Sequence, residues 1–91
     1  MADCCVRAWV TGKVQGVLFR RSTQHQALQY RLTGYAKNLP DGRVEVLLCG
    51  GPEDVKTVSE WLWKGPDGAQ VTHVEFNVLD QCHAPDHFAT Y

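Results

Sequence analysis

Apolar and polar side chains alternate in three separate segments of this chain, and this alternation constrains the fold more than any other feature of the sequence. A period of two puts successive side chains on opposite faces, as in a β-strand that buries one face. The alternating apolar sets are Val6, Ala8 and Val10; Val44, Val46 and Leu48; and Val74, Phe76 and Val78. We therefore predict strands over residues 4–11 and 43–49 and around residues 74–78.

Two stretches between these strands have the pattern of helices. Residues 19–32 contain neither Pro nor Gly and carry a loose apolar stripe, which predicts a helix. Pro52 suits the first position of a second helix, and the two acidic residues after it suit the positive end of the helix dipole. Trp61 and Trp63 near the end of this helix cannot both face the core, so we expect one of them to be partly exposed.

A strong turn signal, Pro-Asp-Gly at residues 40–42, separates a short strand-like stretch at residues 33–38 from the strand at residues 43–49. The two stretches are therefore predicted to form a hairpin. The order of elements becomes β-α-β-β-α-β. This order is typical of an α+β, ferredoxin-like sandwich, in which two helices cover one face of an antiparallel sheet.

The predicted topology brings distant segments together. The first and second strands run parallel, and the third lies between them and antiparallel to both. The carboxyl ends of the first two strands then lie side by side, so the loop at residues 12–19 is expected next to Asn38. The short tail at residues 87–91 has room to add an edge strand.

Length and charge limit the classes of protein to consider. The chain has 91 residues, which predicts a single domain spanning residues 1–91. A net charge of −1 provides no basic field for a nucleic-acid backbone. The first residues lack the pattern of a signal peptide, and no apolar run approaches the roughly 18 residues of a membrane span. We expect a cytoplasmic protein that binds neither nucleic acid nor membrane.

Residues 12–20, which read G-K-V-Q-G-V-L-F-R, lead from a strand end into a helix start. A helix N-terminus offers unpaired backbone N–H groups, and glycines allow a loop to curl around an anion. Arg20 adds a planar guanidinium that matches two phosphate oxygens. The loop is not a Walker loop, because the G-K-[ST] ending is missing. These residues alone leave two interpretations open: a phosphate cradle, or a turn that serves only geometry.

Two motifs in this chain resemble the signatures of the acylphosphatase family. Residues 12–20 are similar to the family's first motif, G-x-V-Q-G-V-x-F-R. Residues 34–44, which begin G-Y-A-K-N, are similar to its second motif, G-[FYW]-x-K-N-x-x-x-G-x-V. The order and spacing of the motifs, the chain length and the order of elements also suit the family. Leu18 occupies a position that varies within the family, often as Gly or Phe.

The resemblance implies a role for each matching residue. The loop backbone and Arg20 would bind the phosphoryl group of an acyl phosphate, and Asn38 would orient the attacking water through its side-chain amide. The loop residues implied are Gln15, Gly16, Val17, Leu18 and Phe19. The activity implied is that of an acylphosphate phosphohydrolase, with a carboxylate and inorganic phosphate as products. Neither a metal, nor a cofactor, nor a covalent phosphoenzyme is implied.

The residue types of the two motifs suit this chemistry. A carboxylate is a good leaving group, so phosphoryl transfer from an acyl phosphate needs mainly positioning and charge stabilisation. Arg20 and the backbone donors can supply the stabilisation, and the Asn38 amide can align one water. Neither motif offers a side chain suited to act as nucleophile or strong base. A phosphate oxygen of the substrate is therefore the hypothesised acceptor of the water's proton.

Two alternatives to an active enzyme have to be weighed. Ferredoxin-like sheets also bind RNA on their open face, and Arg7, Trp9 and Tyr35 lie on predicted strands. The strand at residues 43–49 has no aromatic residue, however, which argues against an RNA-binding module. A catalytically idle acylphosphatase-like domain is the second alternative, and the presence of both Arg20 and Asn38 argues against it. We expect a monomer that acts on a small acyl phosphate, with Arg21 solvated or weakly steering the substrate.

The cysteines do not form a zinc or thioredoxin-like motif, because there is no C-x-x-C. By parity Cys5 and Cys49 point away from the apolar core face, on strands whose antiparallel pairing would make them neighbours. A disulfide between them is one interpretation, and two free thiols in a reducing cytoplasm are the other. The ligand-rich run at residues 82–87 (Cys82 to His87) matches no zinc spacing and is interpreted as a solvated loop.

Overall fold

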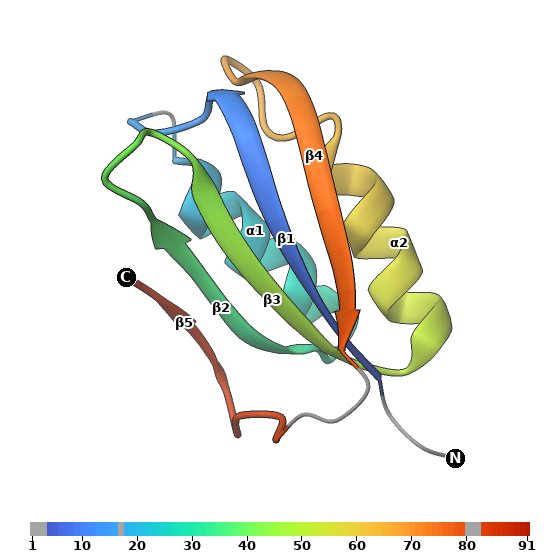
Figure 1. The fold of residues 1–91 in the computed structure, drawn as a ribbon. Coiled ribbons are helices and arrows are strands. Elements are labelled where there is room, and N and C mark those ends of the chain that lie inside the picture. The colour runs from blue at the N-terminus through green and yellow to red at the C-terminus, as the bar shows by residue number, and fades with distance from the viewer. Residues whose placement is uncertain (1–3, 17, 80–82) are drawn as a thin grey trace.

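The computed structural model describes residues 4–16, 18–79 and 83–91. Its elements follow the predicted order, with one short strand added at the end (Figure 1). They are β1 (Cys4–Lys13), α1 (Phe19–Gln29), β2 (Thr33–Asn38), β3 (Val44–Gly50), α2 (Pro52–Leu62), β4 (Gln70–Leu79) and β5 (Phe88–Thr90). The predicted ferredoxin-like α+β fold is confirmed. Neither helix in the described part of the chain is long and apolar enough to cross a membrane.

The five strands form one sheet in the order β4-β1-β3-β2-β5. β3 lies between β1 and β2 and is antiparallel to both, as the topology predicted. β4 pairs antiparallel with the other edge of β1. β5 is the edge strand predicted for the tail, and it runs parallel to β2, so the sheet is mixed rather than purely antiparallel. The direction of β5 depends on where the chain returns to the sheet, which strand periodicity does not specify.

The hydrophobic core fills the space between the sheet and the two helices, which both lie on the same face (Figure 1). The alternating apolar residues of β1 and β3 face the core, with Val6 partly buried at its edge. On β4 only Val74 is buried, while Phe76 and Val78 are 38% and 67% exposed. Helix α2 contributes Val55, Val58 and Leu62 to this core. Trp61 packs against Phe19 with ring centroids 5.9 Å apart, while Trp63 is 50% exposed, so one of the two tryptophans faces solvent as expected.

Helix α1 ends at Gln29, three residues earlier than predicted. Arg31 adopts the left-handed conformation with φ 60° and breaks the helix. The N–H of Leu32 then donates to Ala27 O at 2.8 Å, and the N–H of Arg31 donates to Leu28 O at 3.2 Å. These bonds form a Schellman turn that directs Leu32 into the core. No residue type near Gln29 indicates this ending, because a Schellman turn usually has Gly at the left-handed position.

The other face of the sheet carries a smaller cluster of Cys5, Leu47 and Cys49, packed by Tyr35 and Leu79. Cys5 and Cys49 are register partners of β1 and β3 with Cα atoms 4.1 Å apart, and the structure joins them in a disulfide. Both are almost fully buried. The bond therefore ties the start of β1 to the end of β3, at the end of the sheet away from the β2–β3 turn.

Candidate active site

The loop between β1 and α1 lies at the same end of the sheet as the end of β2 and the β2–β3 turn (Figure 1). Asn38, the last residue of β2, has the parity of the buried Ala36, which faces the helix layer. The side chain of Asn38 therefore points toward the start of α1. A hollow of about 320 Å³ opens between them. Its lining residues are Val14, Gly16, Leu18, Phe19, Arg20, Arg21, Asn38 and Thr90.

The backbone of the loop leaves the first turn of α1 open to a ligand. Gly16 has φ 79° and Leu18, at the N-cap position, has φ 60°, so the loop curls immediately before the helix. The O of Leu18 accepts the first helical hydrogen bond, from the N–H of Ser22 at 2.9 Å. Leucine has no polar side-chain atom that could cap the N–H groups of the first helical turn. These donors and the positive end of the helix dipole face the hollow and favour an anion there.

Gln15 ties the loop to the hairpin that carries Asn38. Its side-chain Nε2 donates to Leu39 O and to Arg43 O, both at 2.9 Å. These carbonyls flank the β2–β3 turn, one residue after Asn38 and at the start of the return strand. The side-chain amide of Gln15 is thus occupied by the hairpin, and it fixes the distance between the loop and the end of β2.

Arg20 is held by the end of the chain's last strand. Its Nη1 donates to the backbone O of Tyr91 at 2.6 Å, and the N–H of Asn38 donates to the same oxygen at 3.2 Å. The N–H of Tyr91 in turn donates to Ala36 O at 2.9 Å. One oxygen therefore positions both Arg20 and Asn38. The guanidinium has five N–H donors, so this single bond leaves most of them for a ligand.

Asn38, one of the residues that line the hollow, has a side-chain acceptor that is not used. Its side-chain Oδ1 is buried and has no hydrogen-bond partner among the described residues. A buried carbonyl oxygen without a partner is costly and calls for an explanation, which a ligand or substrate water would supply. No acidic residue is among the lining residues that the structure describes, whereas Arg20 and Arg21 both line the hollow. The hollow is thus suited to an anion with a polar group next to it.

The open face of the sheet has a different character. Glu45 accepts hydrogen bonds from Trp9 Nε1 at 2.9 Å and from the Tyr35 hydroxyl at 2.5 Å. Burial raises the pKa of Glu45, but these two bonds and the charges of Arg7 and Lys37 outweigh it and hold the pKa below its ordinary value. Burial, together with the hydrogen bond to Glu45 and its charge, raises the pKa of Tyr35. A carboxylate that engages both aromatic side chains disfavours RNA on this face.

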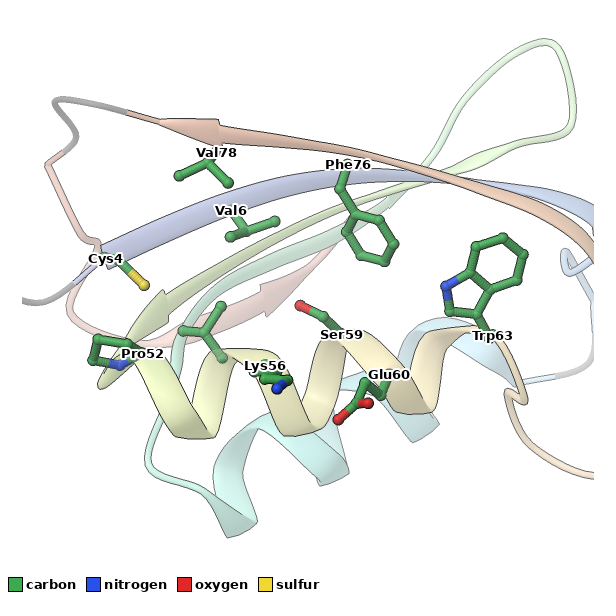
Figure 2. Close-up of a pocket in the computed structure, with 10 residues that line it drawn as sticks. Cys4, Val6, Pro52, Lys56, Ser59, Glu60, Trp63, Phe76 and Val78 are labelled. Carbon is green, nitrogen blue, oxygen red and sulfur yellow. The ribbon is translucent and has the colours of Figure 1, made fainter.

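A second hollow, between α2 and the edge strand β4, is almost entirely apolar (Figure 2). Figure 2 shows Val6, Phe76 and Val78 on the sheet side facing Ser59 and Trp63 on the helix side. None of its lining residues belongs to either sequence motif. Apart from Lys56, Ser59 and Glu60 its lining is apolar, so it offers no group of donors comparable to the one at the start of α1.

The structure brings most of the sequence-predicted site residues together. Gly16, Leu18, Phe19, Arg20 and Asn38 line one hollow. The side chain of Phe19 is buried in the core, so only its backbone is available to a ligand. Gln15 is next to the hollow, and its amide faces the hairpin instead. Val17 lies outside the described residues.

Sequence reasoning missed the contribution of the chain's end. Thr90 lines the hollow and the backbone of Tyr91 holds Arg20. No local signal marks these residues, because they reach the site only through the pairing of β5 with β2. In the ligand-rich run, Cys82 lies outside the described residues, while His83 and His87 are exposed. Within residues 4–16, 18–79 and 83–91, no three potential metal-ligating side chains of His, Cys, Asp or Glu come together.

Comparisons with known proteins give a consistent result. The sequence model of the acylphosphatase family matches residues 6–90. An acylphosphatase of Chromohalobacter salexigens is 63% identical over 75 residues, which are 82% of this chain and 83% of the relative. An acylphosphatase of Halorhodospira halophila is 51% identical over 83 residues, covering 91% and 89% of the two chains.

Solved structures agree with the sequence comparisons. The structure of an acylphosphatase from Coxiella burnetii superposes with a TM-score of 0.93 at 37% identity, covering 98% of this chain and 93% of that one. The crystal structure of an acylphosphatase from Bacillus subtilis gives the same TM-score at 31% identity, covering 97% and 98%.

Proposed function

The chain belongs to the acylphosphatase family and hydrolyses acyl phosphates to a carboxylate and inorganic phosphate, and we propose that Arg20 and the loop before it hold the phosphoryl group while Asn38 orients the water. One observation carries the proposal. Asn38, whose buried Oδ1 has no hydrogen-bond partner among the described residues, lines the same hollow as Arg20 and the uncapped start of α1.

The phosphoryl group binds at the start of α1. Backbone N–H groups of the loop and first turn donate to its oxygens, and the free guanidinium donors of Arg20 engage it as a planar fork. As the P–O bond to the acyl group breaks, the charge on the phosphoryl oxygens is stabilised by donors already fixed in place. Tyr91 O and the amide of Gln15 keep Arg20 and the loop in position.

The water attacks from the side of Asn38. One O–H of the water donates to Asn38 Oδ1, which leaves a lone pair of the water oxygen directed at phosphorus. The new P–O bond forms as the bond between phosphorus and the carboxylate oxygen breaks, and the acyl group leaves as a carboxylate. The proton of the water passes to a phosphate oxygen of the substrate. The chain needs no nucleophile of its own for this step.

The test compares wild-type protein with Arg20→Gln and Asn38→Ala in the hydrolysis of benzoyl phosphate with EDTA present. Loss of a charged donor or of the water-positioning amide is expected to lower kcat/KM by about 10²–10³-fold in each variant, because both act on the transition state. Arg31→Gln and Asn77→Ala, two exposed residues away from the hollow, serve as matched controls. Retention of more than half of the wild-type activity in either site variant would exclude the proposed role.

Hydrolysis in ¹⁸O-labelled water shows whether water attacks phosphorus or the acyl carbon, and an isotopically chiral phosphoryl group distinguishes direct attack from a covalent intermediate. Direct attack inverts the configuration at phosphorus, whereas a phosphoenzyme retains it. Direct attack puts one label into the released phosphate in a single turnover. Label in the carboxylate, or an unlabelled first-turnover phosphate followed by enzyme-bound label, would contradict direct attack.

We also propose that the chain acts as a single-domain cytoplasmic monomer without nucleic-acid partners. Its net charge of −1 and the glutamate on the open face support the absence of nucleic-acid partners.

A further inference from the structure

A third hollow, of about 460 Å³, lies between the start of α1 and the end of α2. It is lined by Arg21, His25, Trp61, Lys64, Pro66 and Asp67, among others. Arg21 also lines the hollow between Asn38 and the start of α1, where the phosphoryl group is proposed to bind and which we call the phosphate hollow. The two hollows therefore adjoin at this residue. We propose that this α1–α2 groove is the acyl subsite, and that it favours acyl phosphates whose acyl group carries a second negative charge. The proposal rests on the function proposed above.

The direction of the reaction points the acyl group toward this groove. In an in-line displacement the leaving carboxylate departs on the side of phosphorus opposite to the attacking water. Asn38, which positions the water, belongs to the sheet layer at the end of β2. The groove belongs to the helix layer, which lies behind the sheet in Figure 1. Arg21 borders both hollows, so an acyl group that leaves on the side away from Asn38 leaves past Arg21 toward the groove.

The two sides of the groove are fixed relative to each other. The rings of Phe19, at the start of α1, and of Trp61, near the end of α2, are 5.9 Å apart. Gly65 has φ 66°, and a Cβ at this position would lie 2.8 Å from Phe19 Cε2. The turn after α2 therefore packs so closely on Phe19 that only glycine fits. The neighbouring Lys64, which also lines the groove, is therefore held at a defined place along it.

The chemistry of the groove suits an anionic acyl group. Trp61 and Pro66 offer apolar surface on which the carbon atoms of the acyl group can lie. Arg21 and Lys64 are exposed cations, and neither forms an ion pair with any residue that the structure describes. Asp67 is the one acidic residue among the described residues that line the groove, so positive charge predominates. A distal carboxylate or phosphate on the acyl group would thus meet two unpaired cations.

The experiment uses two rigid substrates that differ at one end, 4-carboxybenzoyl phosphate and 4-methylbenzoyl phosphate. The measured quantity is the ratio of their kcat/KM values in wild type, Arg21→Gln, Lys64→Gln and the double variant. Electronic differences between the substrates cancel when the ratio is compared across variants. Two exposed ion pairs predict that the ratio falls roughly three- to tenfold in the double variant, mostly through KM, and that added salt reduces the wild-type preference.

Two further variants test whether the effect is local. Asp67→Asn removes the acidic residue of the groove and is expected to raise the ratio. Lys56→Gln makes the same charge change on the exposed side of α2, outside the groove, and is expected to leave the ratio unchanged. An unchanged ratio in the double variant, with good turnover of 4-methylbenzoyl phosphate, would overturn the acyl subsite and leave the proposed function standing. No turnover of either substrate by folded wild-type protein would overturn both.

Discussion

The contact between Gln15 and the β2–β3 hairpin allows a quantitative test of how the site is held together. We consider Gln15→Leu, which keeps much of the side-chain volume and removes both donors, and Gln15→Glu, which replaces the amide by a carboxylate. In the native protein Nε2 donates to Leu39 O and Arg43 O at 2.9 Å each. The two variants therefore separate the loss of two hydrogen bonds from the introduction of a repulsive charge.

The expected loss of unfolding free energy depends on the hydrogen bonds that the two carbonyl oxygens keep in the variants. Arg43 O still accepts from the N–H of Leu39 at 2.8 Å, and Leu39 O still accepts from the N–H of Gly42 at 3.1 Å. Neither oxygen is left unpaired, so Gln15→Leu loses only the net value of two bonds, about 1–2 kcal/mol of unfolding free energy. In a domain of this size that corresponds to a fall in Tm of roughly 4–16 °C. Gln15→Glu points carboxylate oxygens at two carbonyls and is expected to lose about 3 kcal/mol or more.

Activity is expected to fall together with stability. Gln15 connects the loop proposed to bind phosphate to the strand end that carries Asn38, so its loss lets the two halves of the candidate site move apart. A displacement of a fraction of an ångström between nucleophile and phosphorus predicts a fall in kcat of about tenfold. Gln15→Glu also brings a negative charge next to the anion and should raise KM as well. Urea unfolding followed by tryptophan fluorescence and steady-state kinetics measure the two effects.

Gln70→Leu serves as the matched control, since Gln70 is exposed at the start of β4. The reasoning would be refuted if Gln15→Leu unfolded within about 0.3 kcal/mol of wild type and kept its kcat. It would also be refuted if Gln15→Glu were more stable than Gln15→Leu, because the native amide could then not be acting as a donor to two carbonyls.

Three other perturbations have defined outcomes. Leu18→Gly relieves the left-handed backbone conformation of a residue whose side chain is 66% exposed. The variant should be more stable than wild type by about 0.5–1 kcal/mol in urea unfolding. Destabilisation would mean that the loop is not strained. The pKa of Glu45 is lowered in the folded protein, so its stabilising contribution is present above the unfolded value near 4.5 and is lost as the pH falls through the folded value. Glu45→Gln should flatten this part of the curve of unfolding free energy against pH. An unchanged slope would assign the slope to other groups such as Asp41. Reduction of the disulfide between Cys5 and Cys49, which are separated by 44 residues, should lower the unfolding free energy by about 3–4 kcal/mol, and an equal Tm with and without reductant would contradict it.

Local patterns in the sequence were sufficient for most of the elements and for the residues of the two motifs that the structure brings to one hollow. Alternation identified the strands because burial on one face of a sheet imposes a period of two on the side chains. β4 is nevertheless longer than predicted, starting at Gln70, because pairing with β1 past an irregularity at Thr11 and Gly12 continues the ladder beyond the alternating residues. The predicted end of α1 was three residues too late, because Arg31 adopts a left-handed backbone conformation that its residue type does not indicate.

By itself, the sequence determined the order of the elements, the faces of the strands and the two motifs that contain Arg20 and Asn38, since all of these depend on neighbours within a few residues along the chain. Only the tertiary structure decided how the site is held. Gln15 finds its partners 24 and 28 residues away, and Arg20 finds the oxygen of Tyr91 71 residues away. These contacts depend on strand order and on the parallel docking of β5, so they exist only once the packed sheet has brought distant backbone groups within hydrogen-bonding distance.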